Sequence, residues 1–254
     1  MKRIDFENHF FTREYINYIR NRKEVPREVL TKDGLLMWYT NDICSPRSFE
    51  IDDRQLDLGE GRLKDMDING IDIQVLSMGA PSVQSLDTAA GVTWAKRINY
   101  ELSKIVKRHP NRFVGLACIA PQSPNEAAGE LERAEKLDVP MYIHPDIPST
   151  AMLKPYEGIP FWLNRIDFFW LKPWGGRRPK IERKPSDVIK TNFTITTSGM
   201  FFQPAFMCTY LALGADRIAF AVDYPYEKTE EAVQFMNEVP ICESDKEKIY
   251  HLNA

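Results

Sequence analysis

Residues 216–227 read DRIAFAVDYPYE. The apolar run from Ile218 to Val222 is too short for a typical helix and too unbroken for a strand that is exposed on one face. It is typical of a strand in a parallel sheet that is covered on both faces. Asp223 follows this strand, and Pro225 prevents the chain from continuing the ladder. Ligands bind at the carboxyl ends of parallel strands, so Asp223 is a candidate functional residue; alternatively, its side chain caps the next turn.

An alternation of strands and helices extends over the whole chain. The predicted strands are residues 3–11, 71–78, 112–120, 140–145, 193–199 and 218–222. The predicted helices are residues 12–23, with Thr12 as N-cap, 62–67, 88–109, with His109 as a capping residue, 124–137, 158–172, 201–213, 230–239 and 245–252. Residues 35–53 are expected to be irregular, and no hairpin signal is seen. Alternating strands and helices predict an α/β fold with a parallel sheet.

Length and composition favour one enzyme-sized domain. The chain has 254 residues, of which 43% are hydrophobic, and this length is typical of a single (β/α) barrel, so one domain over residues 1–254 is expected. A net charge of -3 with interspersed signs gives no reason to expect a nucleic acid or a membrane as partner. The charged N-terminus is unlike a signal peptide, and the four cysteines are widely spaced. We therefore expect a cytoplasmic protein with reduced thiols.

Four side chains at predicted strand ends are candidate metal ligands. Glu7 and His9 are two residues apart, so both project from the same face of a strand. His144 ends an apolar strand and is followed at once by a proline, as Asp223 nearly is. Two carboxylates and two imidazoles suit a divalent transition metal better than calcium or magnesium. The alternatives are a salt-bridged Glu7–His9 pair and an ordinary hydrogen-bonded His144.

Residues 158–172 form an aromatic, helix-like segment. We expect most of its aromatic side chains to pack in the core. Arg165 is different, because a guanidinium on an apolar helix usually needs an anion. That anion is either the nearby Asp167 or a substrate carboxylate.

Seven motifs in order along nearly the whole chain show a specific resemblance. They are Glu7-Asn8-His9-Phe10, GIDIQVLS (70–77), RFVGLA (112–117), YIHP (142–145), FWLNRID (161–167), TTSGM (196–200), and LGADR (213–217) running to DYPYE (223–227). Through them the chain resembles the amidohydrolase-2 family of metal-dependent (β/α)8 barrels. The similarity is to its aromatic-acid decarboxylase branch, which handles hydroxylated benzoates such as γ-resorcylate.

The resemblance implies a TIM-barrel-like (β/α) fold and one divalent metal ion, Zn or Mn. It implies that Glu7, His9, His144 and Asp223 are the metal ligands, and that Asp223 and His144 are catalytic. In the family the last aspartate protonates the ring carbon that bears the carboxylate, and CO2 leaves. Arg165 corresponds to a substrate-binding position, and relatives are commonly homo-oligomers. The expected activity is non-oxidative decarboxylation of a hydroxylated aromatic carboxylic acid.

Two internal segments of the family are missing from this chain. One would lie between Ala134 and Glu135, and the other between Glu157 and Gly158, where relatives carry a catalytic His-x-Gly-Glu motif that this sequence lacks. The predicted strands number six, whereas a closed barrel of this type has eight. Either the barrel is open or remodelled, or the sequence omits segments of a longer protein.

Two further functions are compatible with these residues. A metal-bound water could attack a lactone or an amide, because the same ligands lower its pKa. A relative that lost the His-x-Gly-Glu motif could also keep the fold and the metal without turnover.

Overall fold

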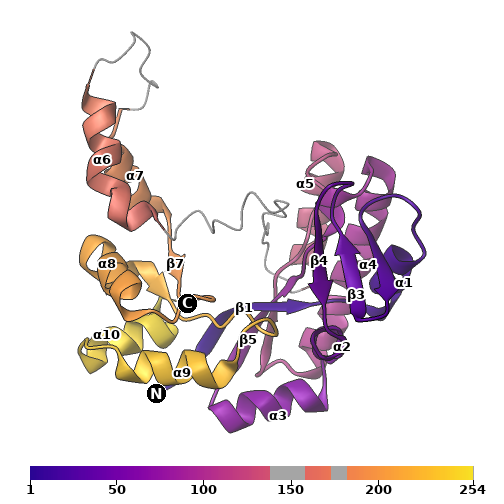
Figure 1. Cartoon of the computed structure of the whole chain (residues 1–254), viewed down its shortest axis with the longest axis horizontal. Coiled ribbons are helices and arrows are strands. Elements are labelled where there is room, and N and C mark those ends of the chain that lie inside the picture. The colour runs from indigo at the N-terminus through magenta and orange to yellow at the C-terminus, as the bar shows by residue number, and fades with distance from the viewer. Residues whose placement is uncertain (138–157, 173–181, 254) are drawn as a thin grey trace.

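Parallel strands form the centre of the computed structural model, which describes residues 1–137, 158–172 and 182–253 (Figure 1). One sheet has the order β1-β5-β6, and β7 pairs in parallel with β8. The bounds are β1 (Ile4–Phe10), β5 (Ile73–Met78), β6 (Phe113–Gly115), β7 (Ile195–Thr196) and β8 (Ile218–Ala219).

The segment after β8 joins the two sheets. The amide of Phe6 donates to the Phe220 carbonyl at 3.0 Å, and the amide of His9 donates to the Tyr224 carbonyl at 2.7 Å. Asn8 and Tyr224 form a parallel bridge. The parallel strands therefore make one array, β7-β8-β1-β5-β6, which does not close into a barrel within the described residues. Among them, the outer edges of β6 and β7 have no further strand beside them.

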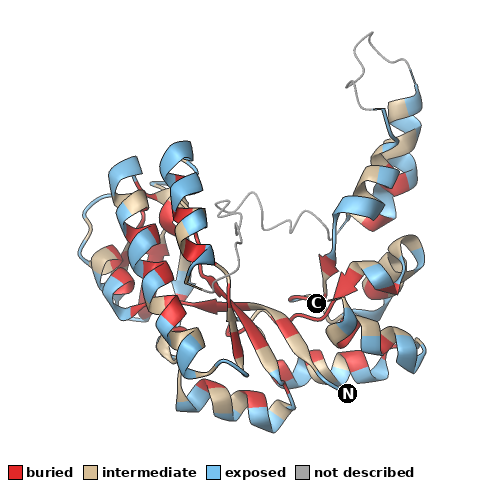
Figure 2. Ribbon diagram, turned by 180° about the vertical axis from the view of Figure 1, so that it is seen from behind, coloured by how far each residue is buried: buried red, intermediate tan, exposed pale blue. Residues whose placement is uncertain are grey.

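Helices cover most of this array, and their buried sides face it (Figure 2). Their bounds are α1 (Arg13–Arg20), α2 (Phe49–Leu56), α3 (Glu60–Asn69), α4 (Thr88–Arg108), α5 (Pro124–Glu135), α6 (Ile159–Leu171), α7 (Pro185–Asn192), α8 (Gln203–Leu213), α9 (Thr229–Glu238) and α10 (Glu243–Glu247), with short helical turns η1 (Val83–Ser85), η3 (Ala215–Arg217) and η4 (Lys248–Leu252). No helix in the described ranges is long and apolar enough to span a membrane.

Several predicted helix ends are confirmed by their caps. The Thr12 side chain accepts a hydrogen bond from the Tyr15 amide and caps α1, and His109 is the C-cap of α4. Gly70 ends α3 in the left-handed conformation, with φ of 66°, where a glycine has no steric penalty.

The prediction for residues 35–53 is wrong. Residues 27–47 form an antiparallel sheet of β2 (Arg27–Thr31), β3 (Gly34–Trp38) and β4 (Cys44–Arg47), and α2 follows it. The overlooked signal is Asp33-Gly34 between two apolar runs, because this pair favours a tight hairpin turn. Gly34 takes a φ of 135° there, which a residue with a side chain rarely adopts.

A buried ionic cluster holds this sheet against the helices. The Arg47 guanidinium donates to Glu28 at 2.8 Å, to Asp52 at 3.2 Å and to the side chain of Gln55. Arg20 donates to the same two carboxylates at 2.6 Å each. Charge-assisted bonds of this kind fix orientation. The cluster thus ties β2 and β4 to α1 and α2.

The aromatic helix α6 is also predicted incorrectly in one respect. Its buried residues are Pro160 and Leu163, whereas Phe161 is 72% exposed and Trp162 is 52% exposed. In Figure 1, α6 and α7 project away from the sheet. Within the described structure the helix packs mainly against α7 and α8, and these two aromatic side chains remain exposed. The predicted strand at 140–145 lies outside the described residues.

A buried carboxyl group fastens β1 to the segment after β8. Asp5 is fully buried, and its Oδ1 accepts hydrogen bonds from the amides of Val222 at 2.9 Å and Glu7 at 3.4 Å. Burial raises the pKa of Asp5 to about 8 against these hydrogen bonds, which lower it. The folded protein therefore favours the neutral acid at neutral pH.

We expect Asp5→Asn to stabilise the protein above pH 4, because an amide avoids the cost of burying a charge. A carboxyl with a raised pKa stabilises the fold fully below its unfolded pKa of 3.8 and loses this contribution as the pH rises through about 8. The variant should gain up to about 1.4 kcal/mol per pH unit over that window relative to the wild type. Urea unfolding at pH 4, 6 and 8 measures this, with the exposed Asp53→Asn as control. If the difference in unfolding free energy between Asp5→Asn and the wild type is the same at all three pH values, the raised pKa of Asp5 is refuted.

Candidate metal centre

Three of the predicted metal ligands lie together at the carboxyl ends of adjacent strands. One potential ligand atom from each of Glu7, His9 and Asp223 lies within 4.8 Å of the others. His9 Nε2 is 3.1 Å from Asp223 Oδ1 and 3.7 Å from Glu7 Oε1. The side chains are 5% exposed for His9, 14% for Glu7 and 16% for Asp223. The cluster is therefore largely shielded from water but reachable.

The backbone at Asp223 directs its side chain toward this cluster. Asp223 has a φ of 79°, which is uncommon for a residue other than glycine and costs free energy. Its backbone carbonyl closes the following turn by accepting from the amides of Tyr226 at 2.8 Å and Glu227 at 3.2 Å. Its amide donates to the Glu7 carbonyl at 3.1 Å. The main chain thus closes the turn, while the carboxylate faces His9.

The two carboxylates control the charge of the imidazole. Burial lowers the pKa of His9, but hydrogen bonds and attraction from Asp223 and Glu7 outweigh burial and raise the pKa to about 9. The cluster therefore binds a proton on His9 at neutral pH when no other cation is present. The negative charge of the two carboxylates therefore favours the binding of a cation at this position.

Neighbouring side chains orient the ligands. Ser77 Oγ lies 3.3 Å from His9 Nδ1, on the opposite side of the ring from the carboxylates. The Thr196 hydroxyl donates to Glu7 Oε2 at 3.4 Å. The Tyr226 ring centre is 5.7 Å from that of His9, and its hydroxyl accepts from Gln55 Nε2 at 2.9 Å. Sequence reasoning missed these supporting residues, although Ser77 lies near the end of a predicted strand and Thr196 and Tyr226 lie in the TTSGM and DYPYE motifs.

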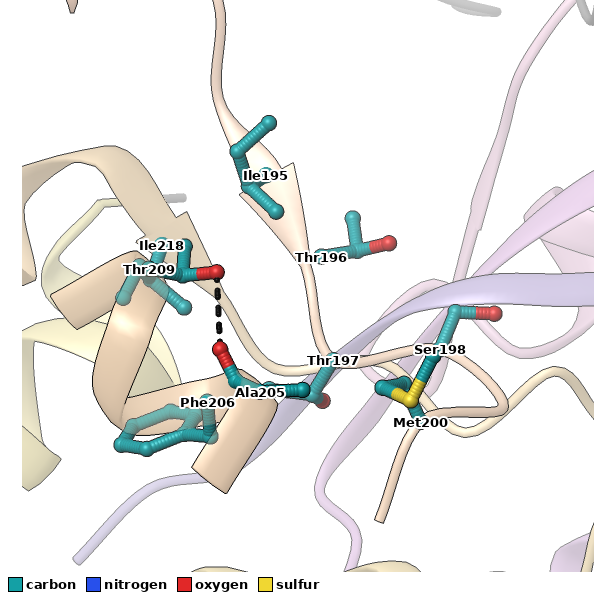
Figure 3. Close-up of a pocket in the computed structure, with 9 residues that line it drawn as sticks. All are labelled: Ile195, Thr196, Thr197, Ser198, Met200, Ala205, Phe206, Thr209 and Ile218. Atoms are coloured by element: carbon teal, nitrogen blue, oxygen red, sulfur yellow. Dashed lines mark hydrogen bonds between the residues drawn. The ribbon is translucent and has the colours of Figure 1, made fainter. Parts of the chain in front are cut away.

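A small cavity lies behind the Thr196 end of the site, between the β7-β8 pair and α8. It has a volume of about 40 Å³, enough for a few water molecules but not for an aromatic ring. Figure 3 shows its lining, in which the Thr209 hydroxyl donates to the Ala205 carbonyl at 3.1 Å. The lining residues are Ile195, Thr196, Thr197, Ser198, Met200, Ala205, Phe206, Thr209 and Ile218.

The described structure does not place the other two predicted site residues at the cluster. His144 lies outside the described residues. Arg165 is exposed on α6, where its guanidinium lies 4.4 Å from the ring centre of Phe169 and 5.3 Å from that of Phe168. Asp167 instead accepts from the amide of Ser186 at 3.0 Å and from its hydroxyl at 2.5 Å. The suggested Arg165–Asp167 pair is wrong, because residues i and i+2 of a helix do not face each other.

The charge on His9 predicts a pH-dependent stability of the metal-free protein. A histidine with a raised pKa contributes stability that is fully present below its unfolded pKa of 6.5 and is lost as the pH rises through about 9. The contribution is at most about 3 kcal/mol. The unfolding free energies of wild type and His9→Gln, measured in chelator at pH 6 and pH 9.5, should therefore converge at high pH. The titration of Asp5 is common to both chains and cancels, so an unchanged gap between them would refute the assignment.

Comparison with known proteins finds relatives that share most of the chain. Residues 170–254 match the family described as amidohydrolase. The chain is 28% identical over 290 residues to a γ-resorcylate decarboxylase of Rhizobium radiobacter, covering 81% of this chain and 88% of the relative. It is 29% identical over 290 residues to a γ-resorcylate decarboxylase of a Polaromonas species, with the same coverage. These alignments are longer than this chain, so the relatives carry segments that it lacks, as the sequence predicted.

Solved structures of similar enzymes share the fold. A 5-carboxyvanillate decarboxylase from Sphingomonas paucimobilis superimposes with a TM-score of 0.81 at 26% identity, covering 99% of this chain and 97% of that one. A dihydroxybenzoic acid decarboxylase from a Polaromonas species, solved with manganese and 2-nitroresorcinol, gives a TM-score of 0.77 at 26% identity, covering 99% and 95%. The predicted TIM-barrel-like α/β fold is confirmed, and the chain is similar in sequence and in fold to aromatic-acid decarboxylases.

Proposed function

We propose that this protein is a metal-dependent carboxy-lyase that removes CO2 from a hydroxylated aromatic carboxylic acid. The observation that carries the proposal is the convergence of Glu7, His9 and Asp223 at the carboxyl ends of adjacent parallel strands. In barrels of this kind, that end holds the catalytic groups. The similarity over most of the chain to γ-resorcylate decarboxylases supports the chemistry.

The residues present fit a divalent transition metal. An imidazole and two carboxylates, all largely buried, form a mixed nitrogen and oxygen donor set that suits Zn or Mn. The raised pKa of His9 is consistent with cation binding, because the two carboxylates stabilise a positive charge at this position. His144 is the proposed fourth ligand, and a catalytic metal site keeps a further position open for substrate.

The proposed reaction breaks the bond between the ring and the carboxylate. The bound metal would stabilise negative charge on the substrate carboxylate and a neighbouring phenolic oxygen. Asp223 would transfer a proton to the ring carbon that bears the carboxylate, forming the C–H bond. The electron pair of the C–C bond then restores the aromatic ring as CO2 leaves, and Asp223 regains its proton from solvent. We assign His144 to catalysis as well as to the metal, and Arg165 to substrate binding.

Metal content and turnover test this proposal together. Chelator-washed protein reloaded with Mn or Zn should hold about one ion per chain, by mass spectrometry, and release CO2 from γ-resorcylate or 5-carboxyvanillate. His9→Ala should lose the ion, because it removes the imidazole donor. Asp223→Asn should lower CO2 release by at least about 100-fold, the usual scale of a general acid.

Two control variants replace the same residue types, a histidine and an aspartate, outside the proposed metal site. His109→Ala alters a helix cap, and Asp216→Asn alters a carboxylate that pairs with Lys248 at 2.9 Å. Both should keep the metal and the rate. Equal CO2 release by wild type and Asp223→Asn would refute the decarboxylase assignment. Metal retention without turnover would indicate a relative impaired by the missing His-x-Gly-Glu motif, and acid release from a lactone would indicate a hydrolase.

Ser77 should support metal binding through His9. The partner of the non-coordinating ring nitrogen fixes the orientation and tautomer of a ligating histidine, and its loss typically weakens metal affinity 10- to 100-fold. We expect Ser77→Ala to weaken Mn binding by about 10-fold or more in a calorimetric titration. Ser103→Ala, which removes a buried hydroxyl that donates to the Tyr100 carbonyl at 2.8 Å, should leave the affinity unchanged. Equal affinities of the two variants would show that Ser77 has no such role.

A further inference from the structure

A single buried arginine touches both segments that carry the metal-binding cluster. Arg62 lies on α3 and is fully buried. Its Nη2 donates to the backbone carbonyl of His9 at 2.8 Å and to that of Arg54 at 3.1 Å. Its Nε donates to the Asp57 carbonyl at 2.9 Å. The guanidinium thus fixes the end of β1 to the connection between α2 and α3.

The same guanidinium packs on the residue that follows Asp223. Arg62 Cζ lies 4.4 Å from the centre of the Tyr224 ring, which is 2% exposed. The Tyr224 carbonyl accepts the hydrogen bond from the His9 amide at 2.7 Å. Arg62, His9 and Tyr224 therefore form a closed set of contacts. Tyr224 directly follows Asp223, the residue with the left-handed backbone, so these contacts tie both ligand-bearing segments to one guanidinium.

The chemistry of Arg62 is unusual for a residue that serves packing alone. Within the described part of the chain it forms no ion pair, and its Nη1 has no hydrogen-bond partner. Burial lowers the pKa of Arg62 to about 10. A buried cation that is paired mainly with carbonyl groups is costly to the fold. Only a planar guanidinium can donate in several directions and also stack on a ring, so a lysine cannot reproduce these contacts.

We propose that Arg62 is a positioning residue that holds His9 and Asp223 at the spacing required for metal binding. The proposal rests on the proposed function, because it takes the Glu7, His9 and Asp223 cluster to be the metal site. Arg62 touches neither substrate nor metal in this assignment. It acts through the His9 carbonyl and the Tyr224 ring.

Arg54 provides a matched control. Its guanidinium also lies over the Tyr224 ring, at 4.6 Å, and its Nε donates to the Tyr224 hydroxyl at 3.4 Å. It pairs with Asp65 at 3.6 Å, and none of its hydrogen bonds in the described residues reaches the cluster. Arg54→Lys therefore removes an arginine from the same ring without disturbing the backbone of a ligand residue.

The experiment measures Mn binding by wild type, Arg62→Lys and Arg54→Lys in calorimetric titrations, with thermal melting of each metal-free chain. We expect Arg62→Lys to weaken Mn affinity by about 10-fold or more, on the scale of other residues that orient metal ligands. Arg54→Lys should keep the wild-type affinity. The paramagnetic resonance spectrum of bound Mn should also broaden in Arg62→Lys, because displaced ligands lower the symmetry around the ion. A fold that is only less stable would leave the spectrum of the bound ion unchanged.

Each result has one meaning. Wild-type affinity and an unchanged Mn spectrum in Arg62→Lys would overturn the positioning role. If Arg62→Lys is unfolded at the assay temperature, Tyr224→Leu decides, because it removes the ring beneath the guanidinium and keeps the arginine with its hydrogen bonds to backbone carbonyls. A similar loss of affinity in Tyr224→Leu supports the proposal, and wild-type affinity overturns it. Failure of the wild type itself to bind Mn refutes the proposed function instead, whatever the variants do.

Discussion

The parallel pairing of β1 with the segment that follows β8 is the interaction on which the rest of the structure depends. It joins two parts of the chain that are 217 residues apart at Asp5 and Val222. The backbone bonds from His9 to Tyr224 and from Asp223 to Glu7 fix the register of this pair. Because this register places Glu7, His9 and Asp223 at one edge, the formation of the sheet and the formation of the site are the same event.

Charge is distributed around this pairing in a consistent way. The carboxyl edge of the strands carries two largely buried carboxylates around His9, while Asp5 is fully buried and is held neutral near pH 7 by burial. Arg62 adds a buried positive charge behind His9. The negative groups are thus concentrated where a cation can enter. This arrangement supports metal-assisted chemistry better than catalysis by the side chains alone.

The chain is shorter than the alignments with its relatives, yet it contains β1 and the segment after β8, which carry Glu7, His9 and Asp223. Within the described residues the sheet is open between β6 and β7, and α6 exposes large aromatic side chains. Glu7, His9 and Asp223 nevertheless converge.

The sequence alone determined the α/β class, most strand and helix positions, and the candidates Glu7, His9 and Asp223, because strand ends and side-chain alternation are local properties. It did not reveal the hairpins of residues 27–47, where Asp33-Gly34 was overlooked, or the exposure of α6. Ser77, Tyr226 and Arg62 were found only in the tertiary structure, because their roles arise from contacts between distant segments that no local pattern records. The tertiary structure alone also determines the 3.1 Å distance between His9 Nε2 and Asp223 Oδ1 and the raised pKa of His9. Both depend on burial and on charges that folding brings together.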